Sequence, residues 1–264
     1  MRLRYTCQNE QNTGGDHAYE DRGGRWGGTL VGQDGTPFSK LPIADRKAAE
    51  AQGHTYYELS PRGCLFYVID GVGGAPLGGR AADMVQAGLN RFTAADPAVA
   101  TTQDVLDLLE QLNVEVRALG LTPDGRSLGA VALTLLWCAP PDKAVLFHVG
   151  DTVAWHLSQG SSRLRQATAD HGVGKVLHRY LGQGPGFAVD VVSVFPQGED
   201  LLVLCSDGVT KGLRISAAER LIAKQMDART VDLAATARDL IRAARRGGST
   251  DDITVVVVEI NEDA

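Results

Sequence analysis

The 264-residue sequence lacks several features that mark other classes of protein. Its four cysteines form no Cys-x-x-Cys pair, so neither a structural zinc site nor a disulfide framework is expected. It has no run of about 18 apolar residues, which a membrane-spanning helix needs. Acidic residues outnumber basic ones by 32 to 26, and a net charge of −6 favours neither nucleic acid nor anionic lipid as a partner.

Common nucleotide-binding and nucleophile motifs are also missing. The glycine-rich residues 71–79 contain neither the lysine of a P-loop nor a GxGxxG pattern, and Ser206 is not surrounded by G-x-S-x-G. The first eleven residues have no apolar region of the kind a signal peptide needs, and most of the cysteines lie in apolar runs, as free thiols do. We therefore expect a cytoplasmic protein.

The sequence does contain strand-like and helix-like segments, arranged in blocks. Continuous apolar runs indicate buried strands, and apolar residues three or four positions apart indicate amphipathic helices. The expected strands are residues 64–70, 132–138, 144–150, 153–157, 201–208 and 251–260. The expected helices are residues 80–95, 103–119, 216–225 and 230–245, with a short one near 44–51.

Blocks of strands and helices, without one-for-one alternation, predict an α+β fold with mostly antiparallel sheets. Strands that are apolar on both faces need cover on both sides, so we expect a four-layer α-β-β-α sandwich. Residues 1–264 are expected to form a single domain. Paired glycines predict an irregular start to the chain, and the polar residues 29–60, broken by glycine and proline, are expected to be an irregular insertion.

Acidic residues gather where the expected strands begin or end. They are Asp70, Asp151, Asp207 and Asp251, together with the pair Glu20 and Asp21. Turn formation explains a single Asp-Gly pair, but several carboxylates beside buried strands are costly unless they are paired or coordinated. Hard cations such as Mg²⁺ and Mn²⁺ prefer these oxygen ligands, and two ions about 3.5–4 Å apart activate a shared water. Gly71 would let its carbonyl approach an ion without a Cβ in the way.

The order of these motifs resembles that of the PPM family of metal-dependent protein phosphatases, the type 2C class, in its bacterial form. The matching segments are residues 20–22, 68–74, 148–152, 168–171, 201–209 and 251–258. The resemblance implies that a metal-activated water hydrolyses phosphoserine and phosphothreonine on proteins, with two Mg²⁺ or Mn²⁺ ions in a cleft at one end of the sandwich. It also implies that the substrate is phosphorylated by a cognate Ser/Thr kinase.

The resemblance assigns roles to the acidic residues by motif position. Asp70 would bridge the two ions, and Gly71 would offer its carbonyl to one of them. Asp207 and Asp251 would complete the second ion's ligands. Asp151, together with Asp207, would form a third and weaker metal site.

The segment before the first acidic pair departs from the family pattern. Glu20 and Asp21 would hold metal-bound waters, and Asp21 counts among the expected metal residues. Most family members carry a phosphate-gripping arginine where this chain has Asp16. His17 and Arg22 are therefore the expected contacts to the substrate phosphate.

Two other functions stay open at the level of sequence. The altered substrate-contacting positions would also suit a catalytically weak regulator that keeps the fold and binds a phosphoprotein or a kinase. A binding module unrelated to phosphate would use the aspartates only as turn residues. The neighbouring Asp170 and His171 invite an acid–base role, but a structural role is favoured for this histidine.

Overall fold

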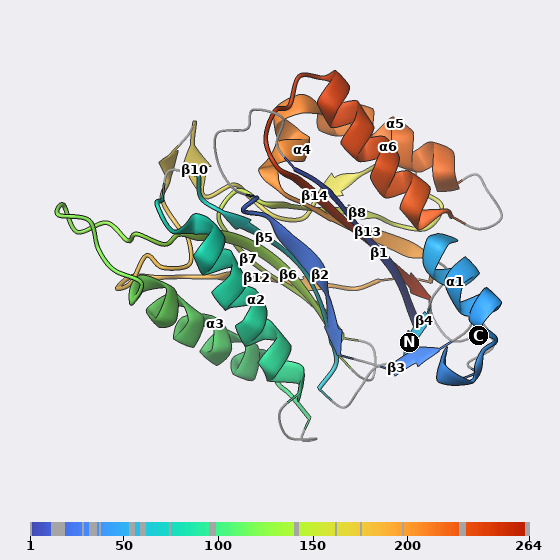
Figure 1. Cartoon of the computed structure of the whole chain (residues 1–264). Helices are drawn as coiled ribbons and strands as arrows, with labels where there is room; N and C mark the ends of the chain where they lie inside the picture. Colours follow the sequence, from blue (N-terminus) through green and yellow to red (C-terminus); the bar gives the residue numbers. More distant parts are fainter. Residues whose placement is uncertain are drawn as a thin grey trace.

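The structure is a computed structural model that describes residues 2–11, 19–27, 29–31, 36, 38–52, 56–58, 62–73, 75–94, 99–139, 143–161, 163–174, 176–196, 198–226 and 231–261. Two antiparallel sheets stack face to face, and helices cover the outer face of each (Figure 1). The expected α+β class and the four-layer α-β-β-α arrangement are confirmed.

The larger sheet has seven strands in the order β3-β4-β1-β14-β13-β8-β9. These strands are β1 (Arg2–Glu10), β3 (Thr29–Val31), β4 (Tyr56–Glu58), β8 (Val153–Leu157), β9 (Arg165–Gln166), β13 (Asp200–Cys205) and β14 (Ile253–Asn261). Its outer face is covered by α4 (Asp207–Gly212), α5 (Ile215–Met226) and α6 (Leu233–Arg246) (Figure 1).

The smaller sheet has five strands in the order β12-β7-β6-β5-β2. These strands are β2 (Arg22–Gly27), β5 (Cys64–Gly71), β6 (Val131–Ala139), β7 (Lys143–Val149) and β12 (Asp190–Val194). Its outer face is covered by α2 (Gly78–Ala94) and α3 (Thr102–Arg117), and α3 begins with a capping box at Thr101. The remaining elements are η1 (Phe38–Lys40), α1 (Ile43–Gln52) and the hairpin of β10 (Gly172–Val173) and β11 (Val176–Leu177).

Three hydrophobic cores hold the four layers together. In β5, Leu65 and Ile69 face the helices α2 and α3, whereas Phe66 and Val68 face the other sheet. The same alternation runs along β14, where Val257 faces the helices and its neighbours face the central core. Because successive residues of a strand point to opposite faces, a strand that is buried on both sides must be apolar throughout, as the sequence indicated.

The start of the chain differs from the irregular structure expected for it. β1 pairs with β14 along its whole length, and its polar residue Arg4 is buried because it forms an ion pair with Glu259 at 2.6 Å. In β2, a Cβ on Gly23 would lie 2.4 Å from the Thr254 side chain of the opposite sheet. The glycine therefore marks a close approach between the sheets and not a loop.

Further elements that were not expected from the sequence are β12, the short helix α4, the two-residue strand β9 and the hairpin of β10 and β11. Within residues 29–60 the expected short helix is α1, while β3 and β4 pair with each other and β4 pairs with β1. These strands extend the edge of the seven-stranded sheet, so the described part of this segment is more regular than its composition suggested. The other expected helices and strands lie within a few residues of their predicted positions.

Candidate metal centre

Asp70 lies near the end of β5, a buried interior strand of the five-stranded sheet, and is followed by Gly71. The Gly71 amide donates a hydrogen bond to the Glu20 carbonyl oxygen at 3.3 Å, which ties the end of β5 to the segment before β2. A Cβ at Gly71 would lie 2.7 Å from the Gly78 backbone at the start of α2. This close approach requires a glycine here whether or not its carbonyl also contacts a cation.

Asp207 and Asp251 lie just beyond the ends of two neighbouring strands of the larger sheet. Asp207 begins α4 directly after β13, and Asp251 precedes β14. β13 and β14 are antiparallel, with Cys205 paired to Val255, so the end of one strand lies beside the start of the other. The strand order therefore brings together two carboxylates that are 44 positions apart in the sequence (251 − 207).

Asp151 is held by a loop that crosses from β7 to β8, and His171 fixes this loop. The Gly150 amide donates to His171 Nδ1 at 3.1 Å, and the His171 amide donates to the Gly150 carbonyl oxygen at 2.8 Å. Since Nδ1 accepts, Nε2 carries the proton that is donated to Asp190 Oδ2 at 2.9 Å. These contacts give His171 the structural role that the sequence favoured.

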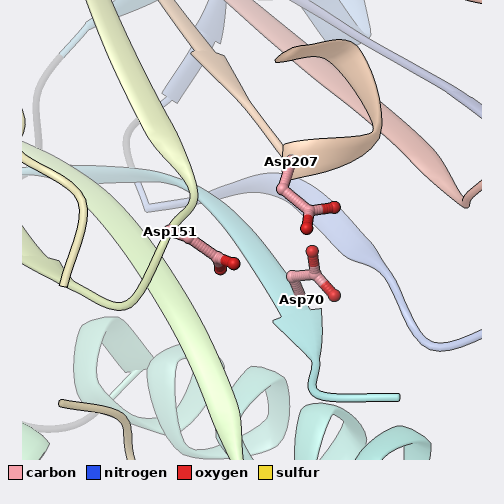
Figure 2. A group of neighbouring side chains, drawn as sticks. All are labelled: Asp70, Asp151 and Asp207. Atoms are coloured by element: carbon pink, nitrogen blue, oxygen red, sulfur yellow. The ribbon is translucent and has the colours of Figure 1, made fainter. Parts of the chain in front are cut away.

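The carboxylates of Asp70, Asp151 and Asp207 converge on one point (Figure 2). Each offers an oxygen atom, and these oxygens all lie within 4.8 Å of one another. Burial raises the pKa of Asp70 well above its usual range, and the charges of Asp21 and Asp207 raise it further. Burial and Asp207 raise the pKa of Asp151 to about 6. Carboxylates held this close repel each other unless a cation lies among them, so the group fits a hard divalent metal.

The cluster opens into a cavity of about 570 Å³. Its acidic lining consists of Glu20, Asp70, Asp151, Asp207, Asp251 and Asp252. The backbone of Gly71 and Gly73 and the side chain of Lys211 also line it. The structure thus brings together five of the six acidic residues that the sequence singled out, at one end of the stacked sheets.

The sixth acidic residue, Asp21, is buried and is not among the described residues that line the cavity. Its Oδ2 atom has no hydrogen-bond partner among the described residues. Burial raises the pKa of Asp21 to about 7, although the Ser206 and Thr254 hydroxyls lower it and the charge of Asp252 adds to the rise. An unpartnered buried carboxylate oxygen next to the cluster fits a ligand of a cation or of its waters.

We expect the ionisation of Asp21 to lower the stability of the metal-free protein as the pH rises from about 4 to about 7. The folded state holds a proton on Asp21 up to a pKa of about 7, whereas the unfolded state releases it near 3.8. This group's contribution is therefore present below pH 3.8 and is lost as the pH rises through 7. In Asp21→Asn the side chain does not titrate, so its contribution to the free energy of unfolding no longer depends on pH. The free energy of unfolding of the variant should exceed that of the parent by on the order of 3 kcal/mol at pH 8.

Urea denaturation in EDTA at pH 4.5 and pH 8 measures this difference. The advantage of Asp21→Asn should shrink at the lower pH, where the parent carboxyl is also neutral. An advantage of the same size at both pH values, or none at pH 8, would contradict the assignment of a raised pKa to Asp21.

The structure does not place either of the two residues expected to contact the substrate phosphate in the described lining of the cavity. Arg22 donates to Asp83 Oδ1 at 2.7 Å and to the Tyr19 and Asp21 carbonyl oxygens, and it is not among the described residues that line the cavity. His17 lies outside the described residues, as does Asp16. The phosphate contact by His17 or Arg22 stays a prediction.

Three residues at the site were missed by sequence reasoning. Asp252 accepts a hydrogen bond from the Glu20 amide at 2.8 Å and so joins the two acidic segments. Arg245, on α6, donates to the carbonyl oxygens of Asp251 and Ser249 and holds that loop in place. Lys211 contacts Asp207 and Asp251, and its position four residues after Asp207 would have been a signal had α4 been predicted.

None of the helices in the described part of the chain combines the length and the apolar character needed to cross a membrane.

Known proteins resemble this chain in both sequence and fold. Residues 61–261 match the family model described as Stage II sporulation protein E (SpoIIE). Protein phosphatase PhpP of Streptococcus pneumoniae is 24% identical over 251 residues, covering 86% of this chain and 98% of the relative.

Solved structures share the fold across almost the whole chain. The S. agalactiae serine/threonine phosphatase superposes with a TM-score of 0.72 at 17% identity, covering 98% of this chain and 100% of that one. The catalytic domain of the serine/threonine protein phosphatase PstP, in complex with two manganese ions, gives 0.70 at 20% identity and covers 99% of each chain. At these identities the similarity establishes the sandwich fold.

Proposed function

The chain belongs to the family described as Stage II sporulation protein E (SpoIIE), and we propose that it is a metal-dependent protein phosphatase acting on phosphoserine and phosphothreonine. The observation that carries this proposal is the convergence of the Asp70, Asp151 and Asp207 oxygens at an open cavity. The named activity of PhpP, and that of the two structural neighbours, supports it.

The side chains of this chain divide into those that would hold cations and those that support them. Two divalent ions would be held by the side chains of Asp70, Asp207 and Asp251 and by the Gly71 carbonyl. The water molecules on those ions would be bound by Glu20 and Asp21. When bound, such ions lower the pKa of a water and neutralise charge on phosphoryl oxygens. The protein's part is to fix the carboxylates on strand ends, so that little reorganisation is needed when the phosphate arrives.

Several finer points belong to the same proposal. The PstP structure with two manganese ions supports a two-ion site, and either Mn²⁺ or Mg²⁺ suits an all-oxygen ligand set. A third ion would bind at Asp151.

The substrate would be the product of a cognate Ser/Thr kinase, and free cysteines at all four positions support a cytoplasmic location. We further propose that residues 1–264 act as one domain, with 29–60 as an insertion.

The test is phosphate release from a phosphothreonine peptide and a phosphoserine peptide, with and without Mn²⁺. Activity should fall by at least ~100-fold in EDTA, because metal ions supply several kcal/mol of transition-state stabilisation. Added Mn²⁺ or Mg²⁺ should restore it. Phosphate release that is indifferent to EDTA would rule out the metal-activated mechanism.

A regulator with weak turnover is the second candidate function. The contact of the Lys211 ammonium with both Asp207 and Asp251 favours it, because a positive charge at these carboxylates opposes the binding of a cation. Full loading with Mn²⁺ and no measurable phosphate release from either peptide would decide for the regulator.

A further inference from the structure

The side chain of Lys211 joins two segments of the candidate metal centre. Its ammonium lies 2.5 Å from Asp207 Oδ2 and also forms an ion pair with Asp251 Oδ2. Asp207 starts the same short helix α4, whereas Asp251 lies 40 residues after Lys211 in the sequence, before β14. A side chain with four rotatable bonds is therefore directed at the same two carboxylates that are proposed to hold a divalent ion.

The backbone of Lys211 is fixed, while its ammonium is accessible. A Cβ on the next residue, Gly212, would lie 2.0 Å from the Ala244 carbonyl oxygen, so α4 sits directly against α6 without room to shift. The Lys211 side chain is 50% exposed and lines the cavity. The ammonium can therefore leave the carboxylates by side-chain rotation alone, without any movement of the helix.

The charge on Lys211 is permanent at physiological pH. Partial burial favours its neutral form, but the charges of Asp207 and Asp251 outweigh burial and raise the pKa of Lys211 above its usual range. An ammonium and a divalent ion that share these carboxylate oxygens are adjacent like charges, and each disfavours the other.

We propose that Lys211 is a built-in competitor for one of the two metal positions, the one between Asp207 and Asp251, and that a divalent ion binds there only when the lysine is displaced. The proposal rests on the proposed function. It makes the two positions unequal: an ion held mainly by Asp70 binds first, and the ion that must displace Lys211 binds more weakly. Lys211 thereby sets the divalent-ion concentration at which the centre is complete.

A purely structural role would look different. An exposed ion pair four residues apart on a helix stabilises that helix only slightly. Such a role needs no contact with Asp251, and its loss would not change the affinity for metal. The measurements must therefore separate metal affinity from folding stability.

The experiment is a calorimetric titration of the metal-free full chain with MnCl₂. In the parent chain we expect two unequal binding steps. In Lys211→Met the weaker step should tighten about tenfold, because binding no longer requires a charge-assisted contact to be broken. Lys224→Met, in the last turn of α5, is the matched control: it makes the same change in net charge at an exposed lysine outside the cavity lining and should titrate like the parent.

Thermal unfolding gives a readout independent of calorimetry. Without metal, Lys211→Met should melt below the parent because two neighbouring carboxylates lose their shared counter-ion. With saturating Mn²⁺ the order should reverse, so the metal-induced rise in melting temperature is larger in the variant. Lys211→Gln, which is also neutral but keeps a polar end, should behave in the same way and serves if the methionine variant does not fold.

The outcomes separate this inference from the proposed function. If the parent and both neutral variants bind Mn²⁺ with the same affinities, the role of Lys211 is refuted while the metal centre stands. If none of them binds Mn²⁺, the metal centre and the role of Lys211 fail together. A weaker Mn²⁺ step in the variants would also overturn the inference, since it would make Lys211 a supporter of the metal.

Discussion

Replacing Asp70 by asparagine is expected to lower Mn²⁺-dependent phosphatase activity by on the order of 1,000-fold or more. Asp70 stands at the end of β5, where its oxygens lie within 4.8 Å of those of Asp151 and Asp207. An amide has nearly the same shape as the carboxylate but carries no charge and offers one fewer oxygen. The substitution therefore removes the negative charge of the proposed central ligand without leaving a cavity in the core.

The same variant should be more stable than the parent in the absence of metal. Burial and the neighbouring aspartates raise the pKa of Asp70, which means that its ionised form is unfavourable in the folded protein. A higher melting temperature in EDTA, measured on the sample that shows the loss of turnover, excludes misfolding as the cause. Asp45→Asn, at an exposed position on α1, is the matched control and should keep full activity. Unimpaired turnover in Asp70→Asn would remove Asp70 from the centre.

Replacing Gly208 by alanine should destabilise the protein by about 3 kcal/mol and weaken Mn²⁺ binding at the same time. A Cβ on Gly208 would lie 1.9 Å from the carbonyl oxygen of Asp252. That neighbour is backbone, which cannot rotate away as a side chain can. The added methyl group must push α4 away from the segment before β14, and with it Asp207 away from Asp251.

Gly79→Ala provides the comparison for this prediction. A Cβ on Gly79, in the first turn of α2, would meet its nearest neighbour at 3.7 Å, which is an ordinary contact distance. Alanine there should change the free energy of unfolding by no more than about 1 kcal/mol, and in the stabilising direction. Urea denaturation and Mn²⁺ titration of both variants give the test. A Gly208→Ala protein as stable as Gly79→Ala would mean that the contact between α4 and Asp252 is looser than described.

The elements that sequence analysis located best are those buried on both faces. The continuous apolar runs of β5 and β14 could lie only inside a stack of layers. Asp70 lies near the end of β5, and Asp251 lies just before the start of β14. Among the strands it missed, β1 and β12 owe their pairing to strands far away in the sequence. β1 contains Arg4, a residue type that sequence patterns assign to the surface. It is buried only because Glu259 lies opposite it on β14 and forms an ion pair with it.

The candidate site was predictable to the extent that its residues lie at the ends of such runs. Asp70, Asp207 and Asp251 could be named because a charge beside a buried strand needs a reason. Lys211 could not, since the expected strand ran through residue 208 and no helix was expected after it, where the structure has a six-residue helix. Only that helix directs a side chain four positions onward back at its own first residue.

The acidic residues of the centre come from both sheets, and this gives the layer between the sheets an influence on chemistry. Asp70 is carried by the five-stranded sheet and Asp207 by the seven-stranded one, while small and large side chains such as Ala154 and Phe66 fill the space between. The thickness of that layer therefore sets the distance between the carboxylate oxygens of Asp70 and Asp207. A bulkier residue in this layer would contact no substrate. It would nevertheless push the two sheets apart, increase the distance between the carboxylates and so change their affinity for a cation.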